Sequence, residues 1–458
     1  MSNICILTDH PNRDLPGNLI LAKELIKKKH KVFLIPTKFM EECFLINPHL
    51  VIANHSRLIY EKFLKKLNEK KIKIQILDTE GAPFGANNSH YKFYPTTVTK
   101  YLDYIQYYYL WGYNQFEMIS KYMKKKNLLY KNNLMISGSP MFDYHKIINR
   151  KKRKNKKIII LINLGFALAN PRFSKNPNIE IENIKREINV KDKIARNNFK
   201  TQEKSFKNSL KFISKISKKI SKKYKILLNP HPFENYEIYK KYFGDKKNIL
   251  ILKRNNIVPV INTSDIILSI NCQTSIDSLL LNKPTLNLNF LNKKMIMSPI
   301  LSKASIQIKS FKQCLNIINN FSFKETTFLD KLDSQKKILE KYFNNFKTTS
   351  ADKISKNISK IKFKPTIKLN IIDYLYFIIS KHKLLGTIKI IILFLLIKLR
   401  FKKNYYKLGF EKKKYMAEIL KHIKNISRDS EKLSTKNCHY KLTFFGNIRL
   451  NSTEIILR

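Results

Sequence analysis

The strongest constraint on the fold is the alternation of short apolar segments with segments of helical spacing in the first third of the chain. Apolar segments at 4–8 and 31–36 flank the stretch 18–29, where Leu19, Ala22, Leu25 and Ile26 recur at helical intervals. Further strand-like segments lie at 50–53, 72–77 and 134–137. Strands that alternate with helices predict a parallel sheet covered by helices on both faces.

The same pattern restarts after a very basic run at 150–157. A solvated linker and a polyanion-binding patch both fit this run. A basic amphipathic helix is expected at 203–222, and strands at 158–162, 226–228, 249–252, 266–270 and 285–288. We therefore predict two doubly wound α/β domains, at 1–150 and 156–320, a helical crossover at 321–365 and a basic, mainly helical tail at 366–458.

The net charge of the chain is extreme, but its total does not locate a binding surface. The 458 residues include 89 Lys and Arg against 33 Asp and Glu, a formal charge of +56. Lys, Asn and Ile are abundant throughout, which is typical of a bias toward A and T in the coding sequence. A basic nucleic-acid-binding protein without catalytic activity is one alternative, although the basic runs lack interleaved aromatic residues.

The sequence contains no pattern typical of secretion or of a membrane span. The first residues fit a strand and not a signal peptide, and the five cysteines form no CxxC pair, so we expect a cytoplasmic protein. The apolar run at 390–397 is too short to cross a bilayer. Apolar helices expected at 369–379 and 387–399 either pack on the domains or hold residues 366–403 on an anionic membrane surface.

Polar loops follow four of the predicted strands, where open α/β sheets bind their ligands. The residues of interest are Asp78, Glu80 and Gly81 after 72–77, Asn163 after 158–162, His231, Pro232 and Glu234 after 226–228, and Gln273, Thr274, Ser275 and Asp277 after 266–270.

Each loop permits a functional and a purely structural interpretation. A partly desolvated Glu80 suits proton transfer, whereas Asp and Gly are also ordinary turn residues. His231, held between two prolines, can donate to a phosphate or take a proton. The hydroxyls of Thr274 and Ser275 at a helix start suit an anion, and they equally suit simple capping of that helix.

Several reaction classes are disfavoured by missing motifs. The sequence has no HExxH, no DxD at a strand end and no His/Cys cluster with ligand spacing, so we expect no metal. It also lacks GxGxxG, a Walker A motif and GxSxG, so we expect no dinucleotide cofactor, no P-loop and no serine nucleophile.

Taken together, short segments over residues 4–290 resemble the bacterial surface carbohydrate biosynthesis proteins. The segments are Asn12-Arg13-Asp14-Leu15-Pro16-Gly17-Asn18, Trp111-Gly112, Ser137-Gly138-Ser139-Pro140-Met141-Phe142-Asp143, His231-Pro232-Phe233-Glu234-Asn235, Val258-Pro259, Ser264-Asp265, Asn271-Cys272-Gln273-Thr274-Ser275-Ile276-Asp277 and Lys283-Pro284.

The resemblance implies a GT-B-like fold of two facing Rossmann-like domains, with motifs related to those of bacterial Kdo transferases and sialyltransferases. It implies that Glu80 and Asp78 are catalytic and that Arg13, Gly81 and Gly138 lie on the acceptor side. The donor phosphate and nucleotide would be bound by His231, Pro232, Glu234, Asn163, Gln273, Thr274, Ser275 and Asp277.

The expected function is a metal-independent, cytoplasmic and membrane-peripheral glycosyltransferase of surface polysaccharide, such as a capsule or lipopolysaccharide. Its donor would be a nucleotide-activated sugar, for example a CMP-linked one, and its acceptor a glycan or a lipid-linked glycan. The alternatives are a nucleotide-sugar epimerase, a CDP-alcohol phosphotransferase on the same fold, or a non-catalytic relative.

Overall fold

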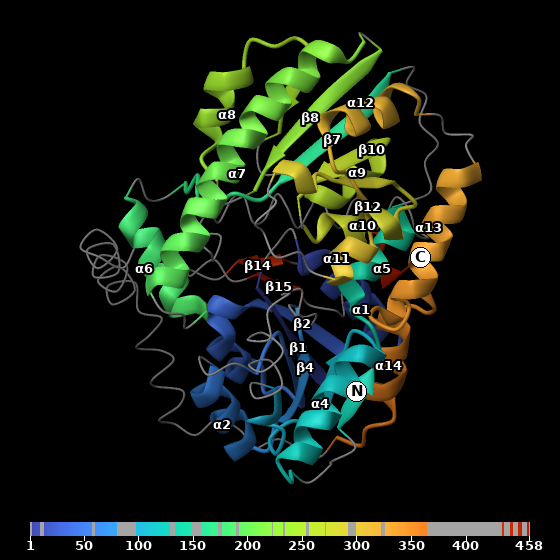
Figure 1. Ribbon diagram of the computed structural model, residues 1–458. Coiled ribbons are helices and arrows are strands. Elements are labelled where there is room, and N and C mark those ends of the chain that lie inside the picture. The colour runs from blue at the N-terminus through green and yellow to red at the C-terminus, as the bar shows by residue number, and fades with distance from the viewer. Residues whose placement is uncertain are drawn as a thin grey trace. The chain divides into compact units, whose positions relative to one another are not determined.

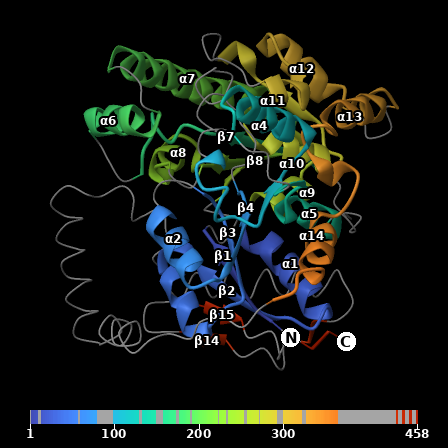
Figure 2. The same cartoon turned by 90° about the horizontal axis from the view of Figure 1, so that it is seen from below.

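The computed structural model consists of two compact units, shown in Figures 1 and 2. It describes residues 2–9, 13–56, 60–79, 98–128, 133–148, 157–172, 176–188, 192–221, 223–231, 234–252, 256–270, 272–291, 299–321 and 326–363, with four short strands between 433 and 457. Unit 1 comprises the described residues before 150 and from 340 onward, and unit 2 those from 151 to 339.

Unit 1 is built on a six-stranded parallel sheet with the strand order β2-β1-β3-β4-β5-β6. The strands are β1 (Asn3–Thr8), β2 (Lys31–Pro36), β3 (Leu50–Ala53), β4 (Lys73–Leu77), β5 (Tyr107–Leu110) and β6 (Leu134–Ile136). Its helices are α1 (Leu15–Lys27), α2 (Glu61–Glu69), α4 (Tyr113–Lys125), α5 (Pro140–Ile148) and α14 (Ser350–Ser359), with the 3₁₀ helices η1 (Thr37–Ile46) and η4 (Asn344–Phe346).

Helices cover both faces of this sheet, with α2 on one side and α1 with α14 on the other (Figure 2). The amphipathic helix α2 packs Phe63, Leu64 and Leu67 against apolar strand residues. On the other face α1 contacts α5 so closely that a Cβ at Gly17 would lie 2.3 Å from the backbone nitrogen of Met141. Only glycine permits this backbone approach.

Unit 2 contains a second six-stranded parallel sheet, with the order β12-β11-β10-β7-β8-β9. Its strands are β7 (Ile158–Leu164), β8 (Tyr224–Pro230), β9 (Ile249–Ile251), β10 (Ile266–Ser269), β11 (Thr285–Asn287) and β12 (Ile306–Gln307). Its helices are α6 (Pro177–Ile188), α7 (Asp192–Lys219), α8 (Tyr236–Phe243), α9 (Ile257–Thr263), α10 (Thr274–Leu280), α11 (Pro299–Lys303), α12 (Phe311–Asn319) and α13 (Thr326–Leu339), with the 3₁₀ helix η3 (Asn289–Leu291).

The long helix α7 supplies much of the core of unit 2. Its apolar side chains Phe206, Leu210, Ile213 and Ile216 are buried in the same cluster as the inward-facing residues of β7, β8 and β10. Its lysines lie on the exposed face, as the helical spacing of the sequence predicts. The helix expected at 203–222 therefore exists, and it begins earlier, at Asp192.

The two doubly wound sheets confirm the predicted α/β fold class. The helices expected at 369–379 and 387–399 lie outside the described residues. The described parts of the tail are the short strands β13 (Leu433–Ser434), β14 (Tyr440–Leu442), β15 (Ile448–Leu450) and β16 (Ile456–Leu457). Within the described ranges, no helix combines the length and apolarity that crossing a membrane requires.

The strand orders identify where each unit is suited to hold a ligand. In unit 1 the chain leaves β1 toward β2 and later returns to β3 on the opposite side of β1. In unit 2 it leaves β7 toward β8 and later returns to β10 on the opposite side of β7. Loops diverge at such a switch point, and the crevice between them is the usual binding site of open α/β sheets.

Candidate functional site

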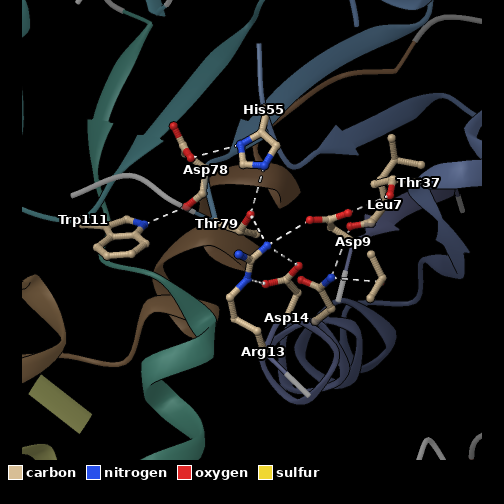
Figure 3. A network of polar contacts seen from close by, with 11 residues as sticks. Leu7, Asp9, Arg13, Asp14, Thr37, His55, Asp78, Thr79 and Trp111 are labelled. Atoms are coloured by element: carbon tan, nitrogen blue, oxygen red, sulfur yellow. Dashed lines mark hydrogen bonds and ion pairs between the residues drawn. The ribbon is translucent and has the colours of Figure 1, made fainter. Parts of the chain in front are cut away.

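The switch point of unit 1 carries a network of polar side chains, drawn in Figure 3. Asp9 and Arg13 follow β1, His55 follows β3, and Asp78 and Thr79 follow β4. Because β1, β3 and β4 are neighbours in the sheet, their carboxyl ends bring these five residues together although the sequence separates them widely.

Asp78 is almost fully buried and has three hydrogen-bond partners in unit 1. Its Oδ2 accepts a hydrogen bond from the Tyr108 hydroxyl at 2.6 Å, and its Oδ1 lies 3.3 Å from Nδ1 of His55. The indole Nε1 of Trp111 donates to its backbone carbonyl at 2.7 Å. Asp78, which the sequence predicted to be catalytic, therefore anchors the end of β4 through its contacts with Tyr108, His55 and Trp111.

Arg13 connects the loop after β1 to the loop after β4. Its Nε donates to Oδ1 of Asp14 at 2.6 Å, and one terminal nitrogen donates to Asp9 at 3.0 Å and to the Thr79 hydroxyl at 3.3 Å. The network thus contains three carboxylates. Asp9 and Asp14 contact the Arg13 guanidinium, and Asp78 contacts the His55 imidazole. The network is rich in hydrogen-bond acceptors, which suits a partner that brings hydroxyl donors.

The other predicted residues of unit 1 lie elsewhere or outside the described residues. Gly138 follows β6 with a positive φ of +84°, and a Cβ there would meet the Asn345 side chain at 2.4 Å. In the structure Gly138 forms a tight turn next to the Asn345 side chain. Glu80 and Gly81, which follow Thr79 directly in the sequence, are outside the described residues.

The switch point of unit 2 carries a row of polar residues at one level of the sheet. Asn229 on β8, Asn163 on β7, Ser269 on β10 and Asn287 on β11 are register partners across four adjacent strands. Register partners in a parallel sheet point to the same face. All four side chains are buried.

Hydrogen bonds connect this row to the loop before α10. Asn229 Nδ2 donates to Asn163 Oδ1 at 2.6 Å, and Asn163 Nδ2 donates to the Thr274 hydroxyl at 2.5 Å. The Thr274 hydroxyl lies 3.1 Å from Sγ of Cys272, and burial raises the pKa of that thiol. The sequence argument placed Asn163 and Thr274 in the same site, and the structure brings them into contact.

The residues around Thr274 make the bonds of a helix start. Ser275 donates from both its hydroxyl and its backbone nitrogen to the Cys272 carbonyl, at 2.6 and 3.1 Å. Gln273 is the N-cap residue, its side chain makes no capping bond, and its carbonyl accepts from the Ile276 nitrogen at 2.8 Å. Asp277 is buried in the first turn of α10.

Glu234 ties the loop after β7 to the loop after β8. Its Oε1 accepts from the backbone nitrogens of Phe166 at 2.7 Å and His231 at 3.2 Å, and its Oε2 accepts from the Tyr239 hydroxyl. Glu234 is buried, whereas His231 is exposed. Glu234 thus shapes the loop that carries His231, and Pro232 lies outside the described residues.

The burial of Glu234 predicts a pH dependence of the stability of unit 2. Burial raises the pKa of Glu234 from 4.5 to about 7, against the opposing effect of its hydrogen-bond donors. At a pH between these two pKa values, the Glu234 carboxyl is ionised in the unfolded chain but protonated in the folded one. The free energy of unfolding should therefore fall by about 3 kcal/mol as the pH rises from about 4.5 to 7.

Urea unfolding of wild type, Glu234→Gln and the exposed control Glu237→Gln across this range measures the effect. Glu234→Gln should flatten the pH profile and Glu237→Gln should leave it unchanged. Parallel profiles for wild type and Glu234→Gln would contradict the assignment.

The sequence patterns did not predict four of the residues that lie in the two networks. They are Asp9, His55, Tyr108 and Asn229. Asn54-His55-Ser56 follows the strand 50–53, so the strand-end argument applied to Asp78 also applies to His55. Tyr108 lies on β5, whose run of tyrosines shows no apolar and polar alternation and was not predicted as a strand.

Comparison with known proteins adds a fold but no family. No family model matches the sequence, and no curated protein matches it. A solved UDP-N-acetylglucosamine 2-epimerase is 10% identical with a TM-score of 0.51, over 81% of this chain and 99% of that chain. The complex of S. aureus MnaA with UDP is 12% identical with a TM-score of 0.50, over 80% of this chain and 99% of that chain. The chain has a GT-B-like fold.

This fold agrees with the one that the resemblance implies, a pair of Rossmann-like units. At identities this low the similarity concerns the fold alone, since one fold supports many reactions.

Proposed function

We propose that this protein is a glycosyltransferase that uses a nucleotide-activated sugar in the synthesis of bacterial surface polysaccharide. The observation that carries the proposal is the presence of a buried polar network at the switch point of both units, on a GT-B-like fold. A fold neighbour solved with UDP supports a nucleotide as the activating group.

The two networks differ in charge, which suggests a division of roles. The described network of unit 2 is built from amides, a hydroxyl and a thiol, with the exposed His231 on the next loop. Uncharged donors and acceptors suit a sugar or nucleoside, and His231 would contact the donor phosphate. The acidic network of unit 1, followed in the sequence by Glu80, would receive the acceptor hydroxyl.

In this proposal the bond from the anomeric carbon to the nucleotide phosphate breaks and a bond to the acceptor oxygen forms. Glu80 accepts the proton of the attacking hydroxyl, and His231 stabilises the charge that develops on the leaving phosphate.

A second candidate function is a nucleotide-sugar epimerase. It is favoured by the fold neighbour that is named a UDP-N-acetylglucosamine 2-epimerase. An epimerase consumes its nucleotide sugar without any acceptor, which gives a direct way to separate the two functions.

The proposal is tested by nucleotide binding followed by product analysis. A thermal-shift screen of UMP, UDP, CMP and CDP should reveal one nucleotide that raises the melting temperature, because a ligand at 100-fold its Kd stabilises the folded state by about 2.7 kcal/mol. Radiolabelled sugars carrying that nucleotide are then incubated with and without a glycan extract.

Label that enters a glycan only when the extract is present supports a transferase, and an epimerised nucleotide sugar without acceptor supports the second candidate. His231→Ala should weaken the nucleotide affinity about tenfold or more. The exposed Lys240→Ala on α8 serves as its control. Absence of binding to every nucleotide would overturn both candidates.

A further inference from the structure

His55 is the buried titratable group at the switch point of unit 1 to which the proposed chemistry gives no role. Its side chain is 5% exposed, and its two ring nitrogens face the two residues that follow β4. Nδ1 lies 3.3 Å from Oδ1 of Asp78, and Nε2 lies 3.4 Å from the hydroxyl of Thr79 (Figure 3).

The neighbouring groups form a continuous chain of polar contacts through His55. An ionised carboxylate only accepts, so the Nδ1 that faces Asp78 carries the hydrogen. A guanidinium only donates, so the Thr79 hydroxyl accepts from Arg13 and keeps a hydrogen and a second lone pair available to Nε2 of His55. The contacts run from Arg13 through Thr79 and His55 to Asp78, so the imidazole joins the Thr79 hydroxyl to the Asp78 carboxylate.

The backbone of the same two residues makes two further contacts. The Thr79 nitrogen donates to the Asn54 carbonyl at 3.3 Å, and the Trp111 indole donates to the Asp78 carbonyl at 2.7 Å. The imidazole adds the contacts that fix the side chains. Without it, the buried Asp78 Oδ1 and Thr79 hydroxyl would each lose a partner, which is costly for buried polar groups.

We propose that His55 is a positioning residue, which through Asp78 and Thr79 orders the chain segment leading into Glu80. This inference rests on the proposed function only for its kinetic consequence. The imidazole nitrogens restrict the motion of Asp78 and Thr79, the two residues that they contact. For the reaction it follows that His55 affects kcat and leaves nucleotide binding unchanged, because a misplacement of about 1 Å can cost about 100-fold in rate.

Packing is the competing role, because the His55 ring also contacts the Tyr60 ring edge-on at a centroid distance of 6.1 Å. Two substitutions separate packing from positioning. His55→Phe keeps an aromatic ring but loses both nitrogens. His55→Gln loses the ring but offers one donor and one acceptor. His49→Phe, which removes a histidine next to the amino end of β3, is the matched control.

The first measurement is hydrogen–deuterium exchange of the full-length protein, which needs no enzyme activity. Peptides containing Asp78 and Thr79 should exchange at least about threefold faster in His55→Phe, and close to the wild-type rate in His55→Gln and His49→Phe. Equal exchange in His55→Phe and wild type would overturn the proposal, and so would equally fast exchange in His55→Phe and His55→Gln.

The second measurement is the kinetics of transfer with calorimetry of the nucleotide. His55→Phe should lower kcat about 10- to 100-fold at an unchanged nucleotide Kd, and His55→Gln should recover most of that loss. If the wild type is active and His55→Phe has the same kcat, the predicted effect of His55 on kcat is wrong. An inactive wild type with the expected exchange pattern would instead overturn the proposed function and leave the positioning role standing.

Discussion

Replacing Glu80 with Gln should lower the rate of sugar transfer by about 10²- to 10⁴-fold, the usual contribution of a positioned general base. Gln has nearly the same size and cannot accept a proton from the acceptor hydroxyl. Because the proposed donor site belongs to unit 2, the nucleotide Kd should stay within about twofold of the wild-type value. Initial rates with labelled donor, together with calorimetry of the nucleotide, measure both quantities.

The matched control is Glu69→Gln, which removes an exposed carboxylate at the end of α2 in the same unit. Its rate should equal that of the wild type. A Glu80→Gln protein with full activity would exclude Glu80 as the base, and the proton acceptor would then have to be sought among the carboxylates of the unit 1 network.

Asp143→Ala should destabilise unit 1 by about 3–5 kcal/mol. The Asp143 carboxylate on α5 accepts from Asn345 Nδ2 at 2.8 Å and from the backbone nitrogens of Ser350 and Ala351, at 3.0 and 2.8 Å. Burial raises the pKa of this carboxyl, against the effect of these three donors. Alanine would leave the three donors without their acceptor, at about 1–3 kcal/mol each and not fully additive.

Urea unfolding followed by circular dichroism measures this loss. Asp352→Ala is the control, because Asp352 also lies at the start of α14 but is partly exposed, and its carboxylate pairs with the exposed Lys356 at 2.8 Å. Such a surface pair contributes less than about 1 kcal/mol. Equal losses for the two variants would contradict the capping role of Asp143.

The same contacts explain the segment 137–143, which contributed to the family resemblance. Gly138 turns with a positive φ beside Asn345, and the Asn345 side chain pairs with both the nitrogen and the carbonyl of Ser139, at 2.9 Å each. Asp143 then caps α14. In the described structure this motif holds the returning chain 344–351 on unit 1, a role that the sequence argument did not consider for Gly138.

Some site residues can be recognised from neighbouring residues in the sequence, whereas the contacts between site residues join positions far apart in the chain. Asp78, Asn163 and Thr274 were found because each ends a strand or starts a helix, and those patterns are local. The pairing of Asp78 with its partners could not be found this way, although His55 also follows a predicted strand. His55, Tyr108 and Trp111 lie 23, 30 and 33 residues from it in the sequence and meet it only because β3, β4 and β5 are neighbours.

The amino-acid sequence by itself determined the two α/β units, most of their strands and the polar strand ends, because apolar periodicity and turn residues act over a few neighbours. The tertiary structure alone decided that Glu234 fixes two loops, that Asp143 caps α14 and that His55 joins Asp78 to Thr79. These pairings depend on strand order and register, which arise from packing of the whole unit and leave no local signal in the chain.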